Sequence, residues 1–200
     1  MSFPIFPTNP NLDVCKHVCT FEFLTKEERD KVEEIVSKID YNDAKVINSD
    51  NNVDGRIDES ARKSKVKWIF FNEETAWLFI KLMKLIEKVN NQNWAFDLIM
   101  AREPIQYTEY QGDGGHYDWH IDVGPRQFSQ RKVSLSLLLS DPNSYEGGDL
   151  EIWPGGEVLK AERVEGGATV FPSFLLHRVT PVTKGVRKSL VFWVGGVPYK

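Results

Sequence analysis

Two histidines and one aspartate in the second half of the chain have the spacing needed to bind one metal ion. His120 and Asp122 are separated by a single residue, and side chains two positions apart on a β-strand project from the same face. His177 lies in the segment FLLHRVTPV, which we also expect to be a strand. It could supply a third ligand if the two strands lie side by side.

Two neutral imidazoles and one carboxylate are a ligand set typical of non-haem Fe(II) sites. They occupy one face of an octahedron and leave three positions free, which a closed structural site would not allow. A His-x-Asp pair also occurs by chance at surface turns. The metal hypothesis therefore depends on the residues that accompany this pair.

Arg187 follows His177 by ten residues and could bind an anion near such a metal. Pro181 and the Lys184-Gly185 pair lie between them and favour a hairpin-like return. That return would bring Arg187 alongside the strand of His177, with its guanidinium pointing inward. A buried arginine needs an anion, and a dicarboxylate that chelates the metal through one end would provide it. The alternative is a surface arginine on an edge strand.

The elements that must position these residues differ between the two halves of the chain. The first half predicts helices over 26–39, where Thr25 and Glu28 form a capping-box pattern, and over 73–91, capped by Asn72. It also predicts short strands near 14–23 and 65–71, and an exposed polar loop over 48–60. Arg62, Lys63, Lys65 and Lys67 alternate in a pattern that favours one charged strand face.

After Trp94, short β-like runs alternate with turn residues. The predicted strands are 95–110, 116–122, 131–139, 149–153, 157–164, 168–171, 175–181 and 187–194. We therefore expect an α+β, mainly β protein. Its core would be a double-stranded β-helix, a cupin-like jelly roll, with N-terminal helices buttressing one face. The chain would form one domain over 1–200, with helical support over about 1–94 and the jelly roll over about 95–200.

Composition narrows the function classes. The 25 basic and 29 acidic residues give a net charge of −4, which argues against nucleic-acid binding. No apolar run reaches the roughly 18 residues of a membrane span, the N-terminus does not resemble a secretory signal, and two cysteines cannot form a disulfide framework. We expect a cytoplasmic protein, a monomer or weak dimer, without nucleic-acid or membrane partners.

Three sequence segments together resemble the Fe(II)/2-oxoglutarate-dependent dioxygenases. They are YQGDGGHYDWHID, RKVSLSLLLSDPNSYEGGDLEIWP and GGATVFPSFLLHRVTPVTKGVRKSLVFWVGG, which occur in the family's order and spacing over about 107–197. The similarity is to the prolyl 4-hydroxylase-like branch and to related bacterial and phage hydroxylases. A fainter similarity lies at ARKSKVKWI (61–69).

The resemblance implies roles for matching residues. The metal ligands for Fe(II) would be His120, Asp122 and His177. The distal carboxylate of 2-oxoglutarate would lie on Arg187, and Tyr110 would line the cosubstrate pocket. Substrate would be bound by Tyr117, Arg131 and Trp193, although core packing is an alternative for Tyr117 and Trp193.

One part of the family pattern is missing. The family often supplies a Tyr or Thr hydroxyl to the distal carboxylate, whereas Leu138, Leu150 and Val191 occupy the corresponding places. Strand parity offers serine hydroxyls instead. Ser134 and Ser136 share a face with Leu138, and Ser189 shares one with Arg187; we predict Ser136 and Ser189 as cosubstrate contacts.

The implied activity is hydroxylation of a proline in a protein or peptide. It would be coupled to O2-dependent decarboxylation of 2-oxoglutarate to succinate and CO2, with ascorbate as an optional reductant. No residue beyond the metal ligands is assigned a catalytic role. The alternatives are a hydroxylase of a free amino acid or other small molecule on the same fold and, from another class, a non-catalytic metal-binding jelly-roll module.

Overall fold

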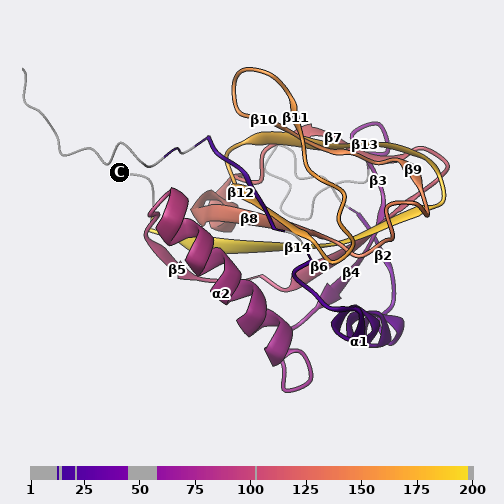
Figure 1. Ribbon diagram of the computed structural model, residues 1–200, viewed down its shortest axis with the longest axis horizontal. Coiled ribbons are helices and arrows are strands. Elements are labelled where there is room, and N and C mark those ends of the chain that lie inside the picture. Colours follow the sequence, from indigo (N-terminus) through magenta and orange to yellow (C-terminus); the bar gives the residue numbers. More distant parts are fainter. Residues whose placement is uncertain (1–12, 14, 21, 45–57, 102, 198–200) are drawn as a thin grey trace, which may run out of the picture.

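The computed structural model describes residues 13, 15–20, 22–44, 58–101 and 103–197. The first half contains two helices and several short strands, and the second half is almost entirely β-structure (Figure 1). The elements are β1 (Val18–Thr20), α1 (Lys26–Ser37), β2 (Asn42–Asp43), β3 (Arg62–Lys63), β4 (Lys65–Ile69), α2 (Ala76–Asn93), β5 (Leu98–Met100), β6 (Ile105–Gln111), β7 (Gly115–His120), a 3-10 helix (Arg126–Gln130), β8 (Arg131–Leu138), β9 (Glu146–Gly147), β10 (Leu150–Trp153), β11 (Leu159–Lys160), β12 (Ala168–Pro172), β13 (Leu176–Lys184) and β14 (Val186–Gly196).

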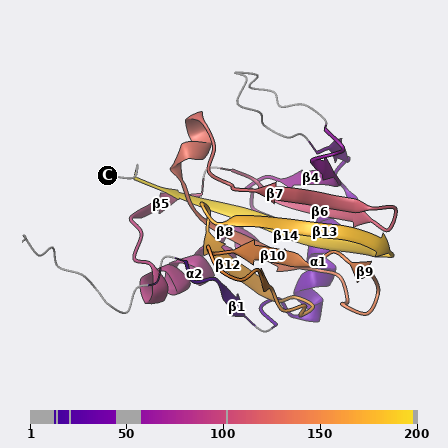
Figure 2. The ribbon, with the colours of Figure 1, turned by 90° about the horizontal axis from the view of Figure 1, so that it is seen from above.

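The strands form two antiparallel sheets that lie one above the other (Figures 1 and 2). The larger sheet has the order β1-β12-β8-β14-β6-β4-β2, with β5 beside β14. The smaller sheet has the order β11-β10-β13-β7-β3, with β9 beside β13. The mainly β, α+β architecture with supporting helices is therefore confirmed.

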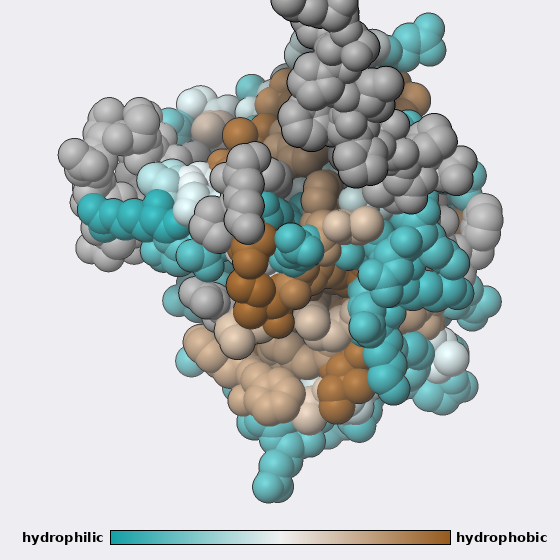
Figure 3. Space-filling view, turned by 90° about the vertical axis from the view of Figure 1, so that its left-hand side faces the viewer, coloured by the Kyte–Doolittle hydropathy of each residue, from teal (hydrophilic) through white to brown (hydrophobic). Residues whose placement is uncertain are grey.

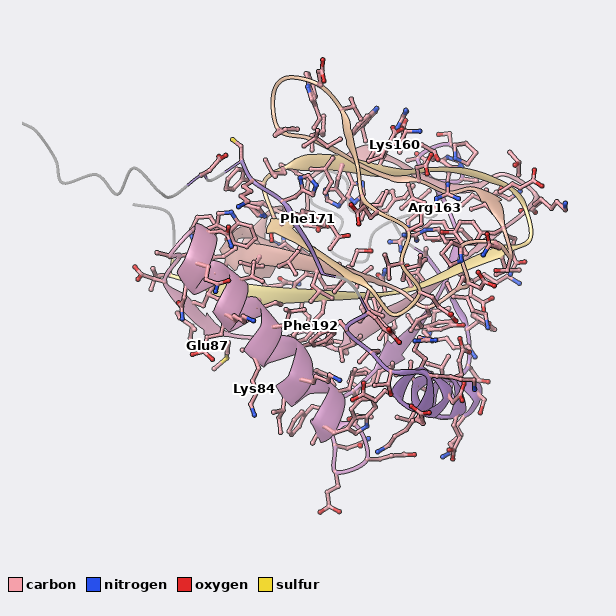
Figure 4. The ribbon with its side chains drawn as sticks, viewed as in Figure 1. Lys84, Glu87, Lys160, Arg163, Phe171 and Phe192 are labelled. Atoms are coloured by element: carbon pink, nitrogen blue, oxygen red, sulfur yellow. The ribbon has the colours of Figure 1, made fainter. Side chains whose placement is uncertain are left out.

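The two faces of the larger sheet have different neighbours, because side chains alternate along each strand. On β14, Phe192 packs into the core beneath α1 and α2, whereas Arg187 and Trp193 line a cavity between the sheets. On β12, Phe171 belongs to the second core, between the sheets. Figure 4 shows this difference: Phe192 lies toward α2 and Phe171 lies between the layers.

The helices largely follow the sequence prediction. The capping box of α1 is present: the Glu28 N–H donates to Thr25 Oγ1 at 3.3 Å, and the Thr25 N–H donates to the Glu28 carboxylate at 2.9 Å. The prediction that α2 begins at 73 was wrong. Asn72 Oδ1 accepts from the Thr75 N–H at 3.0 Å, which holds the segment before Ala76 in a turn. The segments predicted over 95–110 and 157–164 also contain less strand than expected.

The first half does more than support the jelly roll with helices, because β1 to β4 extend both sheets. The prediction of one charged strand face was wrong, because its four residues lie on two strands, β3 and β4, and Arg62 and Lys67 are both buried. Lys67 Nζ donates to the Val36 carbonyl at 2.9 Å and lies over the Tyr41 ring. Most of the predicted loop over 48–60 lies outside the described residues.

The surface has apolar areas as well as charged ones. Figure 3 shows apolar side chains gathered on the face at the left of Figure 1, where β5 lies with Ile99 and Met100 exposed. Neither helix that the structure describes is long and apolar enough to cross a membrane.

Candidate metal centre

His120, Asp122 and His177 converge at one end of the smaller sheet. β7 and β13 are neighbours in that sheet, and His120 lies directly opposite His177. The side-chain atoms that could bind a metal lie within 4.8 Å of one another. Asp122 Oδ2 is 3.5 Å from His177 Nε2, and Asp122 Oδ1 is 3.8 Å from His120 Nε2. Three donors are thus directed at one point.

Asp122 reaches this point differently from the prediction. It lies beyond the end of β7, in a bend, so strand parity does not direct its side chain. Its N–H donates to the Ser173 carbonyl at 2.9 Å, and its Oδ2 accepts from Ser134 Oγ at 2.7 Å. Arg131 Nη1 also donates to its carbonyl at 3.1 Å. The carboxylate is therefore fixed by contacts to the larger sheet.

Backbone carbonyls orient both imidazoles. His120 Nδ1 lies 2.7 Å from the Asp118 carbonyl, and His177 Nδ1 lies 2.8 Å from the Leu175 carbonyl. A carbonyl only accepts, so each Nδ1 carries the hydrogen and each neutral ring keeps its Nε2 lone pair for a metal. The Tyr117 ring stacks on His120 at 3.5 Å between centroids, and Phe171 packs against His177.

The protonation states suit a divalent cation. Burial, followed by the neighbouring His177, lowers the pKa of His120 to about 3. Burial alone would raise the pKa of Asp122, but His177, His120 and Arg131 together lower it to about 2. At neutral pH the site therefore presents a neutral imidazole at His120 beside an ionised carboxylate at Asp122, the forms in which these two groups bind a metal. The residues present fit Fe(II).

Arg187 faces the same cavity from the larger sheet. The prediction that it lies alongside the strand of His177 was wrong: after the turn at Gly185 the chain crosses to the other sheet, and β14 pairs with β6 and β8. Arg187 thus faces the metal centre across the interior. It is 4% exposed, and its Nη1 donates to Ser189 Oγ at 3.1 Å. Among the described residues, no carboxylate lies within ion-pair distance of it.

The cavity has a volume of about 970 Å³ and contains the other predicted site residues. Tyr110 lies under the Arg187 guanidinium, with 5.5 Å between Arg187 Cζ and the ring centroid. Ser136 and Ser189 both line the cavity, together with Leu150 and Val191. Ser134 does not share this role, because its hydroxyl is bonded to Asp122 and Ser173.

The three predicted substrate residues form two separate groups. Arg131 lies over Trp193, with 4.0 Å from its Cζ to the ring centroid. The guanidinium of Arg131 also pairs with both carboxylate oxygens of Glu103. Tyr117 lies on β7 of the smaller sheet, with its ring stacked on that of the metal-ligand candidate His120. All of these side chains line the cavity.

Sequence reasoning missed two further cavity residues, Arg62 and Glu103. Arg62 is paired opposite Tyr117, and its Cζ lies 4.5 Å above that ring. Its Nη2 is buried without a hydrogen-bond partner among the described residues. The faint similarity at 61–69 was the available signal for Arg62, whereas nothing in the sequence singled out Glu103.

Comparison with known proteins agrees with this geometry. A family model described as the 2OG-Fe(II) oxygenase superfamily matches residues 105–195. The PKHD-type hydroxylase YbiX of Escherichia coli is 31% identical over 153 residues, which cover 71% of this chain and 66% of that protein. This chain spans between 42% and 66% of the length of the first curated relatives that it matches.

Two solved structures share the fold. A prolyl hydroxylase from Trichoplax adhaerens, in complex with a hypoxia inducible factor oxygen degradation domain peptide fragment, has a TM-score of 0.73 at 20% identity, covering 90% of this chain and 83% of that one. A prolyl-4-hydroxylase from Pseudomonas putida has a TM-score of 0.63 at 21% identity, covering 90% and 92%. The family model and the curated relative together show that the chain belongs to the 2-oxoglutarate- and Fe(II)-dependent oxygenases.

Proposed function

We propose that the protein is a hydroxylase in which His120, Asp122 and His177 bind Fe(II) and Arg187 binds the distal carboxylate of 2-oxoglutarate. The observation that carries this proposal is the pairing, in one cavity, of a three-donor metal centre with a buried arginine that has no carboxylate partner among the residues that the structure describes. When bound, Fe(II), 2-oxoglutarate and O2 supply the oxidising power to hydroxylate an unactivated C–H bond.

The side chains of the protein bind the metal and the cosubstrate and orient them. The carbonyl contacts to both Nδ1 atoms and the Ser134 hydrogen bond to Asp122 hold the three ligands before any metal arrives. Arg187, with Tyr110, Ser136 and Ser189 around it, would fix the far end of the cosubstrate. No side chain acts as a general base in this scheme.

We propose a proline in a protein or peptide as the substrate. Tyr117, Arg131 and Trp193 line the same cavity as the metal centre, and the structural neighbours include prolyl hydroxylases, one of which is bound to a peptide fragment. Cytoplasmic location, a single domain, a monomeric or weakly dimeric state and stimulation by ascorbate remain predictions.

Product analysis tests the proposal. The Fe(II)-loaded protein is incubated with proline-containing peptides or lysate proteins, with and without 2-oxoglutarate, and mass spectrometry searches for the gain of one oxygen atom. We expect a 2-oxoglutarate-dependent gain on proline together with succinate formation. Turnover of a free amino acid but of no peptide would contradict the substrate class. Absence of succinate under all conditions would contradict the proposal that the protein is a 2-oxoglutarate-dependent hydroxylase.

A further inference from the structure

The Tyr145 hydroxyl is a buried donor without a hydrogen-bond acceptor in the part of the chain that the structure describes. Tyr145 lies just before β9, is 4% exposed, and packs in the core between the sheets. Its Oη is buried and has no hydrogen-bond partner among the described residues. Burying a hydroxyl without a partner is costly, so its position suggests a partner that comes from outside the protein.

Tyr145 lies directly beside the side chain of Arg187. Gly148 adopts a φ of +67°, and a Cβ there would lie 2.9 Å from Arg187 Cδ and 3.3 Å from Tyr145 Cε2. The tyrosine ring edge and the arginine stem therefore meet over the space that this glycine leaves open. A larger residue at this position would separate them.

A second, small cavity lies beside Tyr145 and shares lining residues with the predicted cosubstrate pocket. It has a volume of about 20 Å³ and is lined by Tyr145 as well as by Ser136, Leu150 and Arg187. The latter three residues also line the large cavity. Tyr145 thus lines a small cavity together with the arginine that we propose binds the anion.

The orientation of the Tyr145 ring is itself supported. Arg163 Cζ lies 5.0 Å from the ring centroid, and the guanidinium is held by Asp149, to which its Nε donates at 2.9 Å. Arg163 also donates to the Gly147 carbonyl at 2.5 Å. A cation held over one ring face restricts the movement of the phenol. The hydroxyl of Tyr145 therefore keeps one position in the small cavity.

We propose that Tyr145 Oη donates a hydrogen bond to the carboxylate that Arg187 binds. This proposal rests on the proposed function, because that carboxylate is the distal one of 2-oxoglutarate. A carboxylate accepts about four hydrogen bonds, whereas a guanidinium in a bidentate pair donates two of them. Leu138, Leu150 and Val191 offer no hydroxyl at the places that the family resemblance indicated. Tyr145 would fill that role from a different part of the chain.

The consequence is selectivity for a diacid. A hydroxyl that has a partner only when a carboxylate is present favours 2-oxoglutarate over a 2-oxo acid of the same length with a methyl end, 2-oxopentanoate. The test is calorimetric titration of the Mn(II)-loaded protein with each acid, in the wild type and in Tyr145→Phe. We expect the Kd of 2-oxoglutarate to rise roughly 10-fold in the variant and that of 2-oxopentanoate to stay the same.

Two outcomes would overturn the proposal: an unchanged Kd for 2-oxoglutarate, or an equal loss of affinity for both acids. A matched control is Tyr107→Phe, because that buried hydroxyl donates to Glu109 Oε1 at 2.9 Å in the other core and should not affect either Kd. The melting temperature of ligand-free Tyr145→Phe should equal or exceed that of the wild type, since no bond is lost. A merely structural hydroxyl would lower it.

Arg187→Met separates this proposal from the proposed function. If the wild type itself fails to prefer 2-oxoglutarate over 2-oxopentanoate, and Arg187→Met binds both like the wild type, then the cosubstrate assignment fails. If Arg187→Met loses the preference while Tyr145→Phe keeps it, only the role of Tyr145 fails.

Discussion

Ser134 Oγ donates a 2.7 Å hydrogen bond to Oδ2 of Asp122. This bond joins the two sheets, because Ser134 lies on β8 of the larger sheet and Asp122 follows β7 of the smaller one. Ser173 extends the contact, with 2.9 Å between the two serine hydroxyl oxygens. The carboxylate of the metal centre is therefore positioned by the sheet opposite to the one that carries the two histidines.

Ser134→Ala should weaken metal binding. Without the hydroxyl, Asp122 loses the contact that fixes its second oxygen, and loss of such a partner typically costs about 10- to 100-fold in metal affinity. Calorimetric titration with Mn(II) would measure this as a higher Kd.

Ser140→Ala is the matched control for this substitution. Ser140 Oγ accepts from the Lys188 N–H at 2.7 Å and donates to the Val186 carbonyl at 3.0 Å, and it is not part of the metal centre. This variant should lower the melting temperature and leave the Kd of Mn(II) unchanged. Equal metal affinity in Ser134→Ala and the wild type would show that Asp122 is positioned by other contacts.

Tyr117→Phe should separate substrate binding from metal binding. The phenyl ring keeps the stacking on His120 and the contact beneath Arg62, so the Kd of Mn(II) should not change. Loss of one hydrogen bond to substrate should lower the turnover of a proline peptide by about 3- to 10-fold. The measurement is the initial rate of hydroxyproline formation at subsaturating peptide. An unchanged rate would assign Tyr117 to packing alone.

Asp149 should make stability depend on pH on the acidic side. Burial alone would raise the pKa of Asp149, but hydrogen bonds from Lys160 and Arg163 lower it below its usual value. A carboxyl whose pKa is lower in the folded state contributes stability above the unfolded pKa of about 4, and loses that contribution as the pH falls through the folded pKa.

Asp149→Asn should therefore reduce the free energy of unfolding at pH 7 by about 1–3 kcal/mol. The difference in the free energy of unfolding between Asp149→Asn and the wild type should become smaller below about pH 4. Urea unfolding at pH 7 and at the lowest pH where both proteins stay folded would test this. Asp113→Asn is a suitable comparison, because the Asp113 side chain is 66% exposed in its pair with Lys63, and its loss should matter little. A difference in unfolding free energy between Asp149→Asn and the wild type that is the same at both pH values would contradict the prediction.

Local sequence patterns predicted both helices, most of the later strands and the three residues of the candidate metal centre. The capping box located the start of α1, and short β-like runs between turn residues located most of the later strands. The register that places His120 opposite His177 is a contact between distant segments, and neither segment encodes it alone. Turn residues before Arg187 indicated a reversal of the chain, but not that the next strand joins the facing sheet.

The residues that were missed or misjudged depend on tertiary burial. Arg62 and Lys67 look like ordinary surface cations in a sequence, and only the packing of β3 and β4 makes them buried. Tyr145 lies in a turn-rich stretch with no strand pattern of its own. It lies beside Arg187 at Gly148, where an added Cβ would come close to both side chains; the Gly-Gly pair indicated a turn but not these neighbours.

The most direct test of the central claim is an anaerobic titration of the Fe(II)-loaded protein with 2-oxoglutarate, followed by visible absorption. Chelation by the 2-oxo acid at a three-ligand Fe(II) site should produce a weak metal-to-ligand charge-transfer band in the wild type. The band should disappear in His177→Ala, which removes one of the three donors. A wild type without the band, or a His177→Ala variant that keeps it at full strength, would contradict the assignment of this site.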